Sequence, residues 1–156
     1  MNVNVEKSQV AGAPDAGLKA ETAEKNVRLV AVALIMRGRE VLICQRRSDQ
    51  PMALKWEFPG GKMEPGETAE EALTRELDEE LGIDAKIGAR ITRVRHTYRS
   101  GSAVDLQFFA VHEFGGEITN RIFNDLRWCE LTDLPSYDFL AADRNLVRDL
   151  AAGKLL

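Results

Sequence analysis

The chain has 156 residues, of which 44% are hydrophobic, and carries a net charge of −4 at pH 7. This length and composition are typical of one soluble domain with enough chain to bury a core. The mild acidity excludes the strongly basic surface by which proteins bind nucleic-acid polymers. A polyanionic small substrate would therefore have to be met by local arginines, lysines or metal ions.

Residues 1–26 are rich in Ala, Gly, Glu and Lys, and they contain no apolar run long enough for a signal peptide or a membrane span. We predict a flexible tail over 1–26, followed by a single domain over 27–156. The two cysteines, Cys44 and Cys129, have no Cys or His neighbour at metal-ligand spacing. We expect reduced core cysteines in a cytoplasmic protein with no membrane partner.

The first part of this domain has the pattern of a β-hairpin. An apolar, β-branched run over 27–36 is followed by a polar turn over 37–39 and a second strand over 41–47. A loop with Pro51 leads to a short strand over 56–58. These strands place Arg46 at a strand end and Glu57 within a short strand.

A glycine-rich loop then runs into an acidic helix. Pro65-Gly66 is a turn dipeptide, and Thr68 followed three residues later by Glu71 is a capping box. The helix should therefore begin at Ala69, and Gly82 should end it.

Glutamates interrupt the apolar stripe of this helix. At about 100° per residue, Glu76 and Glu80 fall within the stripe and Glu79 lies at its edge. Burying a carboxylate without a partner costs several kcal/mol, so these side chains need arginines or metal ions. Their i,i+3 and i,i+4 spacing allows their oxygens to converge, and clustered oxygen donors suit Mg²⁺. A buried ion-pair network is the alternative. The apolar members of the stripe are Ala69, Ala72, Leu73 and Leu77.

The remaining pattern completes an α/β domain. We expect a hairpin from strands over 85–97 and 104–114, a polar loop over 117–125, a strand over 126–130 and a helix over 141–152. His96 and Tyr98 lie near a strand end, where they border a pocket or simply pack.

A family resemblance begins at the glycine-rich loop. Gly61, Glu67, Arg75-Glu76-Leu77, Glu79-Glu80 and Gly82-Ile83 occupy every fixed position of the signature of the Nudix hydrolases. The preceding Trp56-Glu57-Phe58-Pro59-Gly60 resembles the MutT-like branch of that family. Weaker similarity continues from about residue 27 to residue 150.

The resemblance implies a Nudix fold, an α/β/α sandwich with a mixed β-sheet between the Nudix-box helix and a C-terminal helix. It implies an Mg²⁺-dependent nucleoside triphosphate pyrophosphohydrolase, with Mn²⁺ as a substitute, that releases a nucleoside monophosphate and pyrophosphate. An 8-oxo-dGTP diphosphatase that cleanses the nucleotide pool is the first expectation. A CTP or modified-dCTP pyrophosphohydrolase and a non-catalytic nucleotide sensor are the alternatives. The expected assembly is a monomer or homodimer.

The same resemblance assigns roles in catalysis and metal binding. Glu76, Glu79 and Glu80, with the carbonyl of Gly60, would hold the metal ions, and Glu79 or Glu80 would be the base for the attacking water. Glu67 and Arg75 complete this catalytic group, since their pairing would fix the loop against the helix.

Substrate contacts are assigned in the same way. Arg46 would contact the base, Lys62 a phosphate, and Asp143 would read the base edge. The ordinary alternatives are a solvated strand end for Arg46 and a first-turn acid for Asp143. As an acceptor Asp143 would suit the N4 amino group of cytosine or the N7 hydrogen of 8-oxoguanine, and a protonated Asp would also satisfy O6.

One position departs from the family pattern. The loop glutamate that supplies another metal ligand in MutT-like proteins aligns with Ile122. Either Asn124, Asp125 or Glu117 replaces it, or the site uses only ligands from the helix. For Glu57 two alternatives stay open: an additional group beside the metal or the phosphates, or a solvated strand-edge acid.

Overall fold

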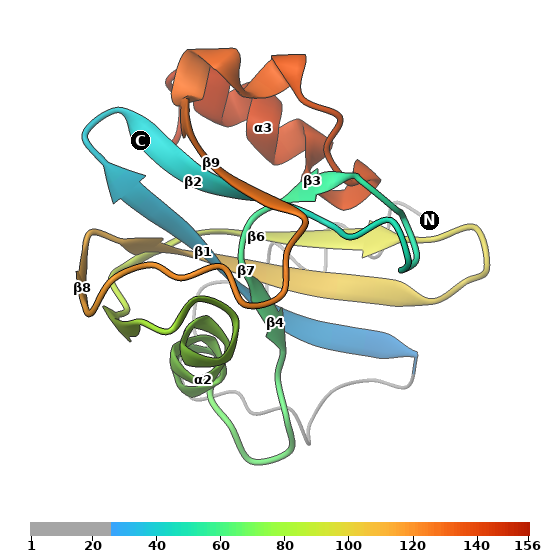
Figure 1. Cartoon of the computed structure of the whole chain (residues 1–156). Coiled ribbons are helices and arrows are strands. Elements are labelled where there is room, and N and C mark those ends of the chain that lie inside the picture. The colour runs from blue at the N-terminus through green and yellow to red at the C-terminus, as the bar shows by residue number, and fades with distance from the viewer. Residues whose placement is uncertain (1–25) are drawn as a thin grey trace.

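A mixed sheet forms the middle layer of the molecule, with one helix on each face (Figure 1). The computed structural model describes residues 26–156, so the predicted tail lies outside the described residues except for Asn26. Helix α2 (Ala69–Leu81) covers one face, and helix α3 (Arg144–Ala151) covers the other. The predicted α/β/α sandwich is confirmed.

Strand β1 is the centre of the sheet. It pairs in parallel with β7 from Val27–Ala103 to Ile35–Val111, and antiparallel with β2 and β4. The strand order is β3-β2-β1-β7-β6, with β4 paired to β1 and β9 to β2. The strands are β1 (Val27–Arg37), β2 (Glu40–Gln45), β3 (Trp56–Glu57), β4 (Gly60–Lys62), β5 (Asp84–Lys86), β6 (Arg90–Thr97), β7 (Ala103–Val111), β8 (Glu113–Gly115) and β9 (Asp125–Glu130).

Alternation along the strands divides the core between the two helices. Successive side chains of a strand point to opposite faces of the sheet. Leu34 and Phe108 pack in the cluster on the α3 side, whereas Ile35 and Phe109 pack with Leu77 on the α2 side. Both helices are thus held against β1 and β7.

The ends of α2 are those that the sequence predicts. Thr68 accepts a hydrogen bond from the Glu71 N–H, and the Glu71 side chain accepts one from the Thr68 N–H, which completes the capping box. At the other end Gly82 adopts a left-handed conformation with φ of 69°, and its N–H donates to the Asp78 carbonyl.

The structure corrects three predicted elements. The expected strand over 85–97 is two strands, and the segment between them runs close to the sheet, since the Gly88 N–H donates to the Ala110 carbonyl. The expected strand over 104–114 divides into β7 and β8, and β8 pairs with β5 in a separate two-stranded sheet. The C-terminal helix begins after a 3₁₀ turn, η3 (Ala141–Asp143), and the preceding connector is the 3₁₀ segment η2 (Leu131–Ser136).

Cys44 and Cys129 are both free thiols in the core, as expected. Burial raises the pKa of Cys44, and it raises the pKa of Cys129 to about 11. Both thiols are therefore protonated and unreactive at neutral pH. Within residues 26–156, no helix combines the length and apolar character that crossing a membrane requires.

Candidate active site

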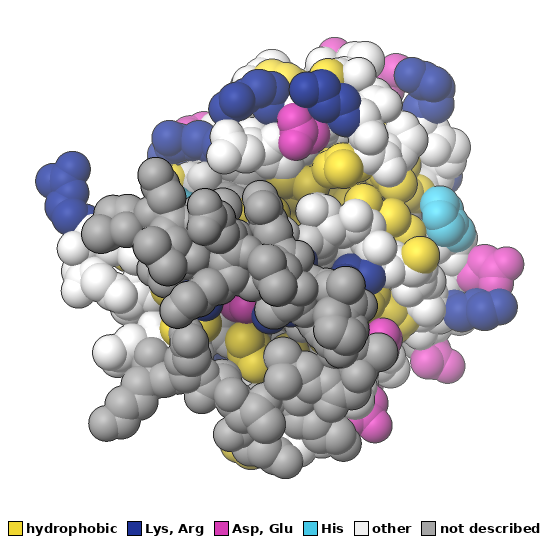
Figure 2. Space-filling view, turned by 180° about the vertical axis from the view of Figure 1, so that it is seen from behind, with side chains coloured by type: hydrophobic (Ala, Val, Ile, Leu, Met, Phe, Trp, Pro, Cys, Tyr) yellow, Lys and Arg dark blue, Asp and Glu magenta, His cyan; other side chains and the backbone are white. Residues whose placement is uncertain are grey.

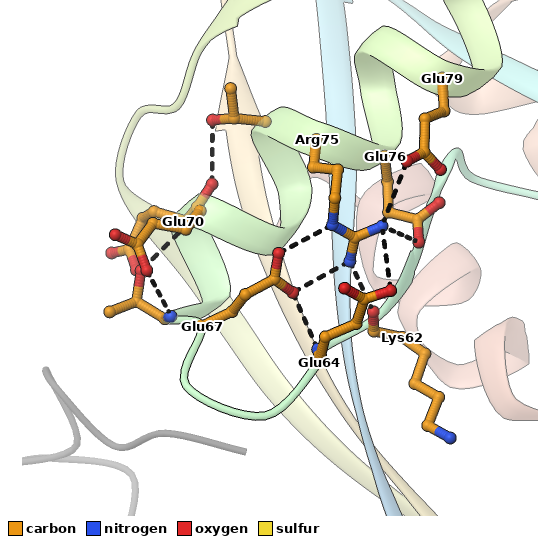
Figure 3. A network of polar contacts seen from close by, with 10 residues as sticks. Lys62, Glu64, Glu67, Glu70, Arg75, Glu76 and Glu79 are labelled. Atoms are coloured by element: carbon orange, nitrogen blue, oxygen red, sulfur yellow. Dashed lines mark hydrogen bonds and ion pairs between the residues drawn. The ribbon is translucent and has the colours of Figure 1, made fainter. Parts of the chain in front are cut away.

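Arg75 ties the glycine-rich loop to α2 (Figure 3). Its Nε and Nη2 donate to the two carboxylate oxygens of Glu67 at 2.7 and 2.9 Å, and Nη2 also donates to the Lys62 carbonyl at 3.1 Å. This paired geometry is the strongest form of an arginine–carboxylate contact. The hydrogen bonds from Arg75 hold the pKa of Glu67 below its ordinary value. The predicted pairing of Arg75 with Glu67 is present.

Glu80 is a buried carboxyl group on the same helix. Its side chain lies against that of Glu76, and its Oε1 accepts a hydrogen bond from the Gly60 N–H at 3.2 Å. Burial first, and then the hydrogen bond and negative charge of Glu76, raise the pKa of Glu80 to about 9. Burial thus favours a proton on the pair, and the two carboxyl groups share a hydrogen bond.

Gly61 allows the loop to lie this close to the pair. A Cβ atom at position 61 would collide with the Glu76 carboxyl group. Glycine is thus required here for space, which gives a physical reason for one fixed position of the motif.

The structure separates the three glutamates into a pair and a third member. Glu79 is 59% exposed, and its Oε2 lies 3.6 Å from Arg75 Nη1, the same nitrogen that contacts Glu76 Oε2 at 3.0 Å. Across residues 26–156, no three acidic, His or Cys side chains converge in an arrangement that could hold a metal ion. The predicted convergence of all three glutamates is therefore not present, and Arg75 Nη1 instead contacts Glu76 and Glu79 at once.

Glu76 and Glu80 nevertheless fit a divalent cation. The two carboxyl groups adjoin each other and are little exposed, so their negative charges need either a proton or a cation. Adjoining carboxylate oxygens are the ligands that a hard divalent cation prefers. Gly60 adjoins this pair through its N–H, and the structure shows no contact of its carbonyl oxygen with the pair.

A cavity of about 490 Å³ opens beside Glu80. Its walls come from β1, from the loop after β2, from β4, from the 117–124 loop and from the segment that precedes α3. It brings together five of the predicted residues and does not include Glu67, Arg75, Glu76 or Glu79. The five are Arg46, Gly60, Lys62, Glu80 and Asp143.

Asp143 reaches this cavity because its segment is attached to β3. The Trp56 N–H donates to the Asp138 carbonyl at 2.9 Å, and the Leu140 N–H donates to the Trp56 carbonyl at 3.0 Å. Asp143 is 5% exposed, and its side chain makes no capping hydrogen bond to α3. Burial, with a smaller contribution from Glu57, raises its pKa to about 7. The Asp143 side chain therefore does not act as a simple cap of α3.

Arg46 and Glu57 form an ion pair in the wall of the cavity. Arg46 Nη1 lies 3.2 Å from Glu57 Oε1, and Arg46 Nε donates to the Pro51 carbonyl at 2.9 Å. Burial raises the pKa of Glu57, and Arg46 offsets part of that increase. Neither residue is a solvated strand end. Their contact follows from the pairing of β2 with β3, which the sequence pattern did not assign.

The 117–124 loop contributes apolar groups to the cavity. Ile122 lines it, while Glu117, Asn124 and Asp125 are not among the lining residues. Asn124 Nδ2 donates to Gln45 Oε1 at 2.7 Å, and Asp125 Oδ1 accepts from the Leu126 N–H at 2.8 Å. None of the three expected replacements for the loop glutamate therefore faces the cavity.

Three further lining residues have side chains suited to a nucleotide. Tyr98 lies in the wall, with His96 packed edge-on against it at 4.8 Å. Arg47 also lines the cavity and donates through Nη1 to the Ile122 carbonyl at 3.2 Å. Arg28 was not assigned from the sequence, although its place two residues before Val30 on β1 puts both on the cavity side.

On the face seen in Figure 2, the described basic side chains are interspersed with acidic ones. The visible described part of that face carries no continuous basic band.

The chain is similar to known proteins in sequence and in fold. The family model for the NUDIX domain matches residues 26–150. A putative 8-oxo-dGTP diphosphatase 2 from Mycobacterium tuberculosis is 38% identical over 124 residues, covering 80% of this chain and 88% of that protein. A CTP pyrophosphohydrolase from Escherichia coli is 35% identical over 123 residues, covering 79% of this chain and 90% of that protein. A solved structure described as MutT from Aliivibrio salmonicida and Vibrio cholerae superposes with a TM-score of 0.70 at 29% identity, covering 81% of this chain and 98% of that chain.

Proposed function

Because this chain belongs to the Nudix family and is a hydrolase that acts on phosphorus anhydrides, we propose that its substrate is a nucleoside triphosphate, which it splits into a nucleoside monophosphate and pyrophosphate. The proposed preferred substrate is 8-oxo-dGTP, and the activity is assigned to a catalytic domain over residues 27–156. Similar proteins carry the names 8-oxo-dGTP diphosphatase and CTP pyrophosphohydrolase. Both names describe cleavage of a nucleoside triphosphate.

One observation carries the proposal. A single cavity joins the buried Glu80 and the exposed Lys62 to the buried Asp143. Glu80 supplies a place for a cation that neutralises phosphate, Lys62 supplies positive charge, and Asp143 supplies a hydrogen-bonding group for a base. This arrangement supports a substrate with a polyphosphate at one end and a base at the other.

We assign Glu76 and Glu80 to hold Mg²⁺ or Mn²⁺, the divalent cations on which this proposal depends. A bound divalent cation would lower the pKa of an attacking water and neutralise charge that develops on the phosphates. Glu79 is the proposed base, because its side chain is 59% exposed and its contact with Arg75, at 3.6 Å, is longer than those of Glu67 and Glu76. The water oxygen bonds to one phosphorus atom of the α–β anhydride, the bridging oxygen departs with the other, and the proton of the water passes to the base.

Arg75 and Glu67 are assigned a positioning role. Their paired hydrogen bonds fix the loop that carries Lys62, and Arg75 Nη1 donates to Glu76 Oε2 at 3.0 Å. Arg46 is assigned to hold the cavity wall through Pro51 and Glu57, so that its contact with the base would come from its remaining N–H groups.

Asp143 carries the base preference. With a pKa of about 7, a substantial fraction of its carboxyl groups is protonated at neutral pH. A protonated carboxyl group offers a donor and an acceptor side by side, which matches O6 and the N7 hydrogen of 8-oxoguanine. The same pair matches N3 and the N4 amino group of cytosine, so a CTP or modified-dCTP pyrophosphohydrolase is the second candidate.

The test is pyrophosphate release with Mg²⁺ from 8-oxo-dGTP, dGTP, CTP, dCTP, 5-methyl-dCTP and ADP-ribose. A lead for 8-oxo-dGTP in kcat/KM supports the proposal, and a lead for cytosine nucleotides supports the second candidate. Glu80→Gln should abolish activity on the best substrate. Glu70→Gln is the matched control, since Glu70 lies on the exposed side of the first turn of α2. Absence of cleavage in the intact protein would favour a nucleotide sensor.

A further inference from the structure

The C-terminal end of α2 is stabilised by a distant loop. The last four carbonyl groups of a helix have no partner within it, and α2 has no basic residue in its last turn. Arg121 Nη1 donates to the Asp78 carbonyl at 2.9 Å, and the Arg121 N–H donates to the Glu80 carbonyl at 3.2 Å. The Thr119 N–H donates to the Leu81 carbonyl at 2.8 Å.

The same loop is fixed at the cavity. The Ile122 carbonyl accepts a hydrogen bond from Arg47 Nη1 at 3.2 Å, and the Asn124 N–H donates to the Gln45 carbonyl at 2.9 Å. Within the loop, Asn120 exchanges side-chain hydrogen bonds with the N–H and carbonyl of Phe123 at 2.8 and 2.9 Å. A closed, bonded turn therefore links the cavity wall to the last turn of α2.

Gly82 leaves room for the contact of Arg121 with the helix end, because glycine has no Cβ atom. A Cβ atom at position 82 would lie 2.9 Å from Arg121 Nη2. The guanidinium group therefore sits directly over the helix end, where positive charge is favourable because the helix carbonyls carry partial negative charge.

We propose that Arg121 is a positioning residue for the metal-binding glutamates of α2. Arg121 does not line the cavity. It fixes the backbone turn from Asp78 to Leu81, and Glu79 and Glu80 project from that turn. A rotation of this turn would move the Glu80 carboxyl group away from Glu76 and from the Gly60 N–H. The inference rests on the proposed role of Glu76 and Glu80 in binding the cation.

The alternative role of Arg121 is to stabilise the fold alone. The two roles differ in what they predict well below the unfolding temperature. A purely stabilising cap would change the melting temperature and leave metal affinity and turnover intact. A positioning residue would change metal affinity and kcat, since groups that orient metal ligands typically contribute 10- to 100-fold to either quantity.

The experiment compares Arg121→Gln and Arg121→Lys with Arg148→Gln in the intact chain. Arg148 is a suitable matched control, since it lies in the last turn of α3, bonds Asn145 Oδ1 at 2.8 Å and does not line the cavity. Mn²⁺ affinity is measured by electron paramagnetic resonance without substrate, and kcat and KM are measured on the best nucleotide.

For Arg121→Gln we expect Mn²⁺ affinity and kcat each to fall by about 10-fold, with KM for the nucleotide unchanged. Arg121→Lys, which keeps the charge and loses the fork geometry, should lie between the wild type and Arg121→Gln. Arg148→Gln should match the wild type. Wild-type Mn²⁺ affinity and kcat in a folded Arg121→Gln protein would overturn the inference.

If Arg121→Gln does not fold, Arg121→Lys decides, and wild-type Mn²⁺ affinity in that variant overturns the inference. Failure of the proposed function gives a different result, because the wild-type protein would then neither bind Mn²⁺ through Glu80 nor cleave any nucleotide. Glu80→Gln distinguishes the two, since it removes the metal site while leaving Arg121 and its backbone contacts in place.

Discussion

The carboxyl groups of Glu76 and Glu80 lie against each other beneath the glycine-rich loop, and a hydrogen bond joins them. A proton held by the pair would remove the repulsion between them. A cation that displaced that proton would bind to the same pair. Glu76 and Glu80 therefore act as a unit, and the predictions begin with their coupling.

The first prediction is that substitutions in the pair are not additive. Glu80→Gln and Glu76→Gln should each lower kcat by about 100-fold or more, because either one removes half of the metal-binding pair. The double variant should be little worse than either single variant, since residues that act as a unit lose their function together. Steady-state kinetics with Mg²⁺ in excess tests this. Losses that multiply in the double variant would show that the two side chains act independently.

The second prediction concerns Gly61. Gly61→Ala should lower the free energy of unfolding by about 1–3 kcal/mol, since the new methyl group would push the Glu76 carboxyl group away from its contacts with Arg75 and Glu80. It should also weaken Mn²⁺ binding, because Glu76 is displaced. Urea unfolding and Mn²⁺ titration measure the two effects. A variant of unchanged stability and unchanged metal affinity would contradict the reason given for this glycine.

The third prediction is a pH dependence of stability that depends on Asp143. Its pKa is raised from 3.8 to about 7 in the folded protein, so the folded state binds a proton more tightly than the unfolded state. The stability that this proton confers is present below pH 3.8 and is lost as the pH rises through about 7.

Asp143→Asn tests that dependence. The asparagine variant should gain stability relative to the wild type as the pH rises from 5 to 8, because Asn cannot ionise. Thermal unfolding across this pH range provides the measurement. Melting temperatures that stay parallel for the two proteins would show that Asp143 does not titrate there.

The fourth prediction concerns Glu57, the negative charge that acts on Asp143. Glu57→Gln should lower the pKa of Asp143, although burial should keep it above 3.8. The change would appear in the pH dependence of KM for the preferred nucleotide, with its midpoint moved to lower pH. Glu57→Gln also removes the ion-pair partner of Arg46, which lies at 3.2 Å, so the contribution of Arg46 to KM must be measured as well. An unmoved midpoint would show that burial alone sets the pKa of Asp143.

The sequence predicts α2 closely because local chemistry determines it. Thr68 and Glu71 fix its start, and Gly82 fixes its end through a left-handed conformation. The division of the 85–97 segment was not predictable, since it depends on a backbone contact between Gly88 and Ala110 on a distant strand.

The candidate site shows the same division between local and long-range information. Glu76 and Glu80 were assigned from their place on the buried stripe of one helix. Glu79 contacts Arg75 because its side chain adopts one particular conformation. The spacing of residues along the helix does not specify that conformation. The contacts of Arg121 with Asp78 join residues 43 apart along the chain, so no local pattern reveals them.

The most direct test of the proposed function is the fate of the oxygen in the attacking water. 8-oxo-dGTP is hydrolysed with Mg²⁺ in ¹⁸O-labelled water, and the products are followed by phosphorus nuclear magnetic resonance. We predict 8-oxo-dGMP and pyrophosphate as the only products, with the label in one of the two, because water attacks the α–β anhydride directly. Release of orthophosphate, products without label, or no hydrolysis of any nucleoside triphosphate would contradict the account.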